Sequence, residues 1–148
     1  HPRQGFLSVF IRRALEDQTI RVFGDGSQLR DLNYVEDVAD AFLALAAAPG
    51  LDGRAFNLGS PEVLSLKAVA ELFIAAAGSG RLELTPFPDH LKRIDIGSYY
   101  GDYTRIRQAV GWEPRISAAD GLRRTIDFYR EHAARYLEDP PAWEQGHD

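Results

Sequence analysis

Apolar residues recur at every third or fourth position in five segments of the chain, a spacing that places them on one face of an α-helix. Ser65 and Ser117 are suited to cap two of these helices, and Ser117 with Asp120 resembles a capping box. Gly78 and Gly111 are typical of helix C-terminal ends. The pattern predicts helices over residues 6–16, 36–48, 65–78, 102–111 and 117–137.

Short runs in which apolar and polar residues alternate lie between these segments and predict β-strands. TIRVF and RLELT show the alternation clearly, and the turn residues Gly24-Asp25-Gly26-Ser27 follow the first of them. The predicted strands and extended segments cover residues 19–23, 29–35, 54–58 and 81–85. Helices that alternate with short strands predict an α/β fold with a small sheet.

Residues 1–137 are predicted to form one domain, because a chain of 148 residues is long enough for a single core. The segment 138–148 contains two adjacent prolines and shows no periodicity, so we expect a loosely ordered tail. The chain holds no methionine and starts at His1. We therefore expect it to be an internal or C-terminal piece of a longer protein.

The composition argues against several kinds of function. The chain has no cysteine, which rules out disulfides and thiolate chemistry and fits a cytoplasmic protein. The four histidines lack metal-ligand spacing, so no metal site is expected. A formal net charge of −5, with no basic run longer than two residues, argues against nucleic-acid binding. The longest apolar stretch, residues 41–49, is too short to span a membrane.

The stretch GDGSQLRD at residues 24–31 raises the question of phosphate binding. Its glycines do not follow the P-loop pattern, and they lack the third glycine and the following helix of a dinucleotide fingerprint. We therefore interpret Gly24 and Gly26 as parts of a tight turn between two extended segments. Arg30 lies just beyond the turn, where its planar guanidinium suits either a phosphate or a salt bridge with an acid such as Asp31.

Residues 22–38 resemble the GDGxQxRDxxYVxDV segment of the extended short-chain dehydrogenases, the NAD-dependent nucleotide-sugar epimerases and dehydratases. The run from Lys92 to Arg105 is similar to the KxIDIGxYYxDYSK of UDP-glucose 4-epimerase-like members. Further stretches resemble motifs of the same family in the same order, namely FNLG at 56–59, GWEP at 111–114 and GLRRTI at 121–126. The resemblance covers about residues 1–137.

The resemblance implies that this chain is the C-terminal, substrate-binding part of a Rossmann-type enzyme. The family's glycine fingerprint for NAD and its Tyr-x-x-x-Lys pair are both absent from the chain. We therefore expect no catalytic residue and no NAD site in this chain, and no activity from the chain alone. NAD is the implied cofactor of the longer enzyme, and the missing N-terminal Rossmann half is the implied partner. Separation from that half is expected to expose apolar surface and to permit self-association.

The resemblance also implies a nucleotide-sugar site, with a UDP-sugar as the expected ligand. Arg30 matches the arginine that contacts the pyrophosphate. Phe23 matches the position beside the base, where its ring can stack on a flat nucleobase with Val22 beneath. Either Lys92 or Arg93 matches a second cation for the phosphates.

Three more positions complete the expected site. Asp95 matches an acidic position near the ribose hydroxyls, from which a carboxylate can accept hydrogen bonds. Asn57 matches a residue that either hydrogen-bonds the diphosphate or orders its loop, and Gln4 lies where the family's loop meets the sugar or phosphates. We expect Asp31 and Asp37 to be structural.

Aromatic residues in the later part of the chain are expected to pack. Tyr99, Tyr100 and Tyr103 are predicted to hold the segment 89–112 against the domain, and Trp112 to fill a gap behind the last helix.

The implied activity of the longer enzyme is that of a UDP-glucose 4-epimerase-like enzyme working through a 4-keto sugar. Two alternatives stay open: a nucleotide-sugar 4,6-dehydratase or decarboxylase, and a non-catalytic nucleotide-binding module. A homodimer of the longer enzyme also stays open as an arrangement. No nucleic-acid or membrane partner is expected.

Overall fold

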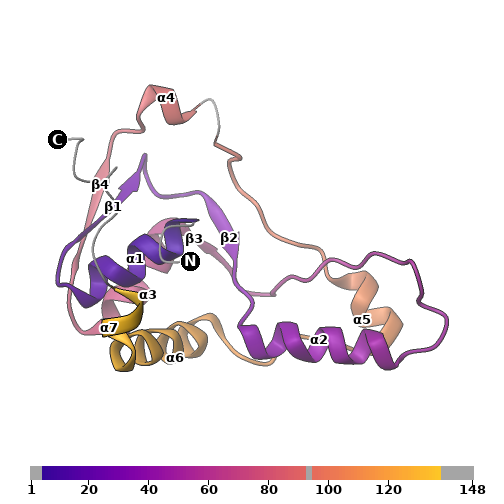
Figure 1. The fold of residues 1–148 in the computed structure, drawn as a ribbon. Helices are drawn as coiled ribbons and strands as arrows, with labels where there is room; N and C mark the ends of the chain where they lie inside the picture. Colours follow the sequence, from indigo (N-terminus) through magenta and orange to yellow (C-terminus); the bar gives the residue numbers. More distant parts are fainter. Residues whose placement is uncertain (1–4, 93–94, 138–148) are drawn as a thin grey trace.

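The computed structural model describes residues 5–92 and 95–137. The elements in chain order are α1 (Gly5–Leu15), β1 (Thr19–Phe23), β2 (Leu29–Asp31), α2 (Val35–Ala47), β3 (Val63–Ser65), α3 (Leu66–Ala77), β4 (Arg81–Thr85), α4 (Asp89–Lys92), α5 (Thr104–Val110), α6 (Ala118–Glu131) and α7 (Ala133–Tyr136). A body gathers α1, α3, α6 and α7 near the paired strands β1 and β4, and an arm containing α2 and α5 extends from it (Figure 1). The predicted α/β class is confirmed.

The body is built on two parallel strands, β1 and β4, in which Thr19 lies opposite Arg81. Ile20 and Val22 alternate with exposed residues along β1 and are buried, as the sequence alternation predicts. Helices α1, α3 and α6 complete the core with their apolar stripes. Its buried members are Phe10, Ile11, Ala14, Ile20, Val22, Val69, Ala70, Phe73, Leu122 and Ile126.

Helix ends in the body follow the predicted capping chemistry. The Ser65 hydroxyl accepts a hydrogen bond from the Ala68 N–H at 3.1 Å, and Gly78 ends α3 with φ 71°. The Ser117 hydroxyl likewise accepts from the Asp120 N–H at 3.2 Å. The Asp120 carboxylate turns to neighbouring arginines, which hold its pKa below the ordinary value, Arg123 first.

No helix within the described ranges 5–92 and 95–137 is long and apolar enough to cross a membrane.

The arm has a small core of its own. Ala41 of α2, Ile106 of α5 and Trp112 are buried against one another, with Phe56 and Leu58 packed on them. The strand predicted over residues 54–58 is wrong, because no strand of the described chain lies beside this segment. In the described chain its apolar residues Phe56 and Leu58 pack onto the arm core instead.

The predictions for Trp112, Tyr99 and Tyr100 are also wrong, whereas Tyr103 does pack. Trp112 packs in the arm against α2 and α5, and Tyr103 meets it edge-on with ring centroids 6.2 Å apart. Tyr99 and Tyr100 are 62% and 56% exposed, so they contribute little packing. Polar contacts hold this part of the chain instead, as described below.

The sequence pattern does not predict the shortest elements. Strand β3 pairs antiparallel with β2, where Arg30 lies opposite Leu64, but three residues are too few to show a period. The single turn α4 lies between the predicted strand 81–85 and the predicted helix 102–111, where the sequence pattern predicts no helix. The predicted final helix is interrupted at His132, whose φ of −108° separates α6 from α7.

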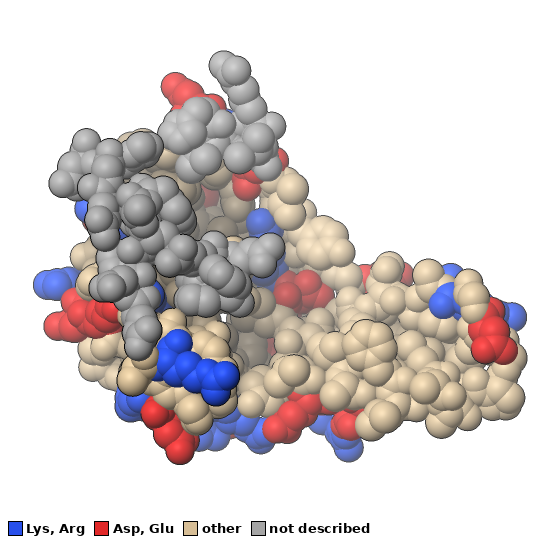
Figure 2. Space-filling model, in the orientation of Figure 1, with Lys and Arg blue, Asp and Glu red and all other residues tan. Residues whose placement is uncertain are grey.

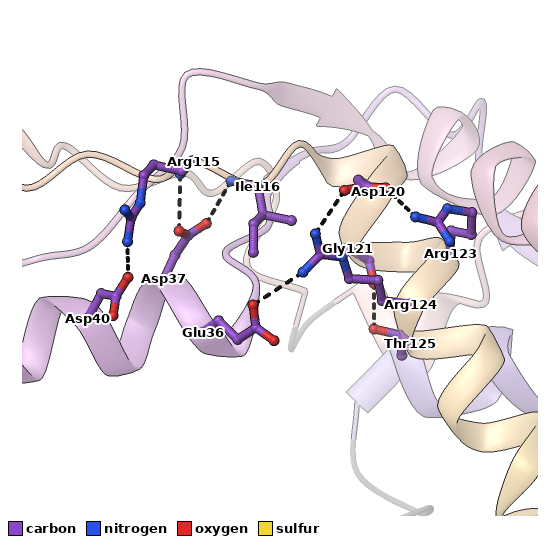
Figure 3. Close-up of polar contacts among 10 residues, drawn as sticks. All are labelled: Glu36, Asp37, Asp40, Arg115, Ile116, Asp120, Gly121, Arg123, Arg124 and Thr125. Atoms are coloured by element: carbon purple, nitrogen blue, oxygen red, sulfur yellow. Dashed lines mark hydrogen bonds and ion pairs between the residues drawn. The ribbon is translucent and has the colours of Figure 1, made fainter.

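The buried carboxylate of Asp37 joins the arm to the segment that leads into α6. Its two oxygens accept hydrogen bonds from the backbone N–H groups of Arg115 at 3.1 Å and Ile116 at 3.0 Å. Its backbone carbonyl accepts from the Trp112 indole N–H at 2.9 Å. Asp37 is 2% exposed, whereas Asp40 lies near the surface and pairs with the Arg115 side chain (Figure 3). The structural role expected for Asp37 therefore reaches well beyond the start of a helix.

Replacing Asp37 with Ala is expected to lower the free energy of unfolding by about 3 kcal/mol, because two partly buried backbone N–H groups lose their acceptor. Asp40→Ala is the matched control, since it removes an exposed ion pair to the same Arg115 and is expected to cost less than about 1 kcal/mol. Urea unfolding of both variants measures the difference. Equal losses would contradict the role assigned to Asp37.

Candidate functional site

The turn after β1 is fixed by its own hydrogen bonds and by α3. The Asp25 carboxylate accepts from both the hydroxyl (2.6 Å) and the N–H (2.9 Å) of Ser27, which lowers the pKa of Asp25. The Gly26 carbonyl accepts from the Lys67 N–H at 3.1 Å, and the Gln28 carbonyl accepts from the N–H of Leu66, the first residue of α3, at 2.8 Å. Residues 24–26 form a turn between β1 and β2, which confirms the interpretation of the glycines. The two backbone hydrogen bonds tie this turn to the start of α3.

Residues 95–101, here called the strap, run beside β2 on the edge away from β3. The Tyr99 N–H donates to the Leu29 carbonyl at 2.9 Å, and the Leu29 N–H donates to the Ser98 hydroxyl at 3.0 Å. Arg30 and Tyr99 form an isolated parallel bridge. The strap therefore extends the β2–β3 pair through a few polar contacts.

Arg30 is held between β2 and the strap. One terminal nitrogen of its guanidinium, Nη1, donates to the Leu29 carbonyl at 2.7 Å and to the Gly97 carbonyl at 2.6 Å. The side chain is half-buried and forms no ion pair with any residue in 5–92 or 95–137. The salt bridge with Asp31 is thus not formed, and Nε and Nη2 of Arg30 donate to no group among the described residues.

Asp95 lies at the start of the strap, next to the Arg30 anchor. Its Oδ2 accepts from the Gln28 side-chain amide at 2.8 Å and from the Gly97 N–H at 3.2 Å. Because Gly97 also anchors Arg30, Arg30 and Asp95 share one support. The structure thus brings together two of the residues predicted from the sequence.

Of the two predicted cations, Lys92 lies in α4 and pairs with Asp89 at 3.0 Å, with 58% of its side chain exposed. Arg93 and Gln4 lie outside the described residues, so the choice between Lys92 and Arg93 stays open.

Phe23 ends β1 and is 38% exposed, with its ring 5.5 Å from the ring of Phe87 in a tilted arrangement. Val22 is 2% exposed and belongs to the body core, so it supports the Phe23 position from within. Asn57 is exposed in the arm loop, which is the segment 48–62 between α2 and β3, and lies two residues before Gly59. The sequence alone does not identify Phe87 as a neighbour of the site, because only its ring contact with Phe23 in the folded chain places it there.

Asp31 joins the strap to the arm loop. Its Oδ2 accepts from the N–H groups of Ser60 at 3.1 Å and Gly101 at 3.0 Å. The two backbones cross here so closely that a Cβ on Gly101 would lie 2.2 Å from the Leu58 carbonyl oxygen, and one on Gly59 would lie 2.3 Å from the Gly101 oxygen. The structural role expected for Asp31 matches this arrangement.

The sequence alone does not identify the residues that support Arg30 and Asp95 through hydrogen bonds. Gln28 and Gly97 supply the hydrogen bonds that orient Asp95 and Arg30. Gln28 lies inside the quoted GDGxQxRD motif, so the motif held a signal for it, whereas Gly97 contributes only backbone atoms.

The fold and the polar junction of β2 with the strap describe a mixed α/β protein. Residues 1–59 match the model of the NAD dependent epimerase/dehydratase family. The UDP-glucose 4-epimerase of Mycolicibacterium smegmatis is 36% identical over 132 residues, which are 88% of this chain and 40% of that protein. A UDP-N-acetyl-alpha-D-glucosaminuronate decarboxylase of Bacillus cytotoxicus is 30% identical (88% and 41%), and a dTDP-glucose 4,6-dehydratase of Streptomyces griseus is 31% identical (90% and 40%).

Solved structures give the same result. The UDP-glucose 4-epimerase of Thermotoga maritima with UDP-glucose superposes with a TM-score of 0.76 at 29% identity, over 90% of this chain and 42% of that one. The WbmF enzyme of Bordetella bronchiseptica in complex with NADH gives 0.75 at 28% identity, over 90% and 39%. The chain belongs to the NAD-dependent epimerase/dehydratase family of extended short-chain dehydrogenases and matches its C-terminal part. It spans about two fifths of the length of the curated relatives it matches.

The turn supports a prediction with a matched control. Gly24 and Gly26 both have φ near +70°, so Ala costs about 1 kcal/mol at either position. A Cβ at Gly26 would also lie 2.9 Å from the Lys67 Cβ, whereas at Gly24 the nearest atom is 3.9 Å away. Gly26→Ala is therefore expected to lose about 2 kcal/mol more than Gly24→Ala, as measured by urea unfolding. Similar losses for the two variants would show that the turn is not pressed against α3.

Proposed function

We propose that this chain is the nucleotide-sugar-binding half of an NAD-dependent sugar-nucleotide epimerase, of the UDP-glucose 4-epimerase kind. The observation that carries the proposal is the anchored Arg30. Two backbone carbonyls accept from its Nη1, and the Nε–Nη2 edge donates to no group in residues 5–92 and 95–137. That edge is suited to grip a diphosphate oxygen pair, because charge-assisted bidentate hydrogen bonds are strong.

The other residues of the site would read the rest of the nucleotide. Phe23 offers part of its ring face at the carboxyl end of β1, where a nucleobase can stack on it. Lys92 or Arg93 would supply the second cation, and Gln4 and Asn57 would meet the sugar or phosphates. Asp95 would accept hydrogen bonds from the ribose.

In the longer enzyme this half would supply binding energy far from the reacting carbon. Held by its diphosphate, the sugar is placed near the catalytic groups and stays free to turn between hydride transfers. The N-terminal half would hold NAD, and hydride transfer is the chemistry that this cofactor would supply. The groups of this chain would bind and orient the substrate and take no proton from it.

The exposed face of α2 supports a second, large partner surface. Val35, Phe42 and Leu43 lie on one side of this helix and are 68%, 69% and 69% exposed. The arm shows a broad surface without charged side chains (Figure 2). We assign this face to the N-terminal Rossmann half of the same enzyme, because large apolar side chains on an otherwise polar molecule mark an interface.

A 4,6-dehydratase or decarboxylase is the alternative parent, since relatives of both names match this chain at about the same coverage. The phosphate site proposed here would serve all of these reactions, because all of them act on a nucleotide sugar.

Nucleotide binding tests the proposal. Backbone amide shifts of the chain titrated with UDP are expected to saturate around Phe23 and Arg30, while NAD gives no saturable shifts. Arg30→Ala is expected to weaken UDP binding at least tenfold, since a hydrogen bond to a charged group contributes about 1.5–3 kcal/mol. Arg21→Ala is the control, because Arg21 is an exposed arginine of β1 paired with Glu83. A folded chain that binds no UDP would overturn the proposal.

The α2 face leads to a further expectation. The chain alone is expected to self-associate at high concentration, and Phe42→Asp with Leu43→Asp is expected to return it to a monomer in sedimentation velocity runs. Phe128→Asp serves as control, since Phe128 is 45% exposed but lies on α6. A monomeric chain at every concentration, or an equal effect of the control, would count against an interface on α2.

A further inference from the structure

The Gln28 side chain reaches from the β1–β2 turn to the Asp95 carboxylate. Its Nε2 donates to Asp95 Oδ2 over 2.8 Å, although the two residues are 67 positions apart in the chain. The neighbouring Leu29, by contrast, contacts the strap through its backbone N–H, which donates to the Ser98 hydroxyl. The contact therefore needs an explanation beyond holding the strap in place.

The base of this side chain is unusually well fixed for a surface residue. The Gln28 carbonyl accepts from the Leu66 N–H at 2.8 Å, and the Gly26 carbonyl two residues earlier accepts from the Lys67 N–H. The Gln28 amide therefore extends from a backbone tied to α3, a helix of the body core. By contrast, the strap that carries Asp95 has an exposed apolar residue, Ile96, which is 70% accessible.

The two carboxylate oxygens of Asp95 differ in their hydrogen bonds. Oδ2 accepts from both Gln28 and the Gly97 N–H, while Oδ1 accepts from no group in residues 5–92 and 95–137. A carboxylate held by one oxygen presents the other in a fixed direction. Such an oxygen can accept hydrogen bonds from two adjacent hydroxyls, as in the 2′,3′-diol of a ribose.

We infer that Gln28 is a positioning residue that aims the free oxygen of Asp95 at the ribose diol of the nucleotide, and so makes the site selective for ribonucleotides. This inference rests on the proposed function, in which Asp95 binds the ribose, and adds to it the residue that orients the Asp95 carboxylate. Gly97 contacts both residues, because its carbonyl accepts from Arg30 and its N–H donates to Asp95. The group that would bind the diphosphate and the group that would bind the ribose are therefore held by the same residue.

The test compares UDP with 2′,3′-dideoxy-UDP, which lacks only the diol. The wild-type chain is expected to bind UDP about tenfold more tightly, the value of one hydrogen bond to a charged group. Gln28→Ala is expected to reduce this ratio to about twofold or less while the affinity for the dideoxy compound stays unchanged. A merely structural role would weaken both ligands together. Gln18→Ala is the matched control, because the Gln18 amide binds Glu16 on the surface away from the strap.

A second variant separates aiming from direct contact. Asp95→Asn is expected to lose the same discrimination, and Gln28→Ala added to it is expected to change the ratio no further, because both act through one carboxylate. An unchanged ratio in Gln28→Ala, with UDP still bound, overturns the inference and leaves the proposed function standing. Failure of the folded wild-type chain to bind either compound overturns both.

Discussion

A single carboxylate oxygen, Oδ2 of Asp31, holds the strap and the arm loop in contact. It accepts from Ser60 on one side and from Gly101 on the other. The backbones it joins meet at glycines because a Cβ on either would overlap a carbonyl oxygen of the other segment. Because the strap also supplies the carbonyl that orients Arg30, the position of the candidate phosphate group depends on this oxygen as much as on β2 itself.

The site and the body are stabilised by different forces. Apolar residues from three helices and β1 hold the body, and each fully buried Val, Leu, Ile or Phe side chain among them contributes about 1.5–3 kcal/mol. The strap buries no large apolar side chain, and its Ile96 and Tyr99 are mostly exposed. Hydrogen bonds to Leu29, Arg30 and Asp31 hold it instead. A segment held in this way keeps its polar groups in fixed directions, which is what recognition of a polar ligand requires.

The sequence predicts what depends on local pattern. Helices α1, α3 and α6 and strands β1 and β4 show their period and caps over enough residues to be recognised. Strand β3 and the strap arise from pairings across more than thirty positions, and no local pattern encodes them. In the site, Arg30 and Asp95 were found through a resemblance, while the groups behind them needed the tertiary contacts. The buried Asp37 shows the same limit: its place in the first turn of α2 is local, but its partners lie 78 and 79 positions away.

The largest departures from the sequence pattern lie together in the arm. Residues 54–58 have the composition of a strand but no strand beside them in the described chain, and α2 carries apolar residues on a face that nothing described covers. The hydrophobic pattern of a segment depends on everything that the segment packs against in the whole protein. Under the proposed function the two departures have one cause, because a Rossmann half would supply both a sheet edge for 54–58 and a surface for Phe42 and Leu43. The mismatch between pattern and structure therefore marks where the rest of the enzyme would join this half.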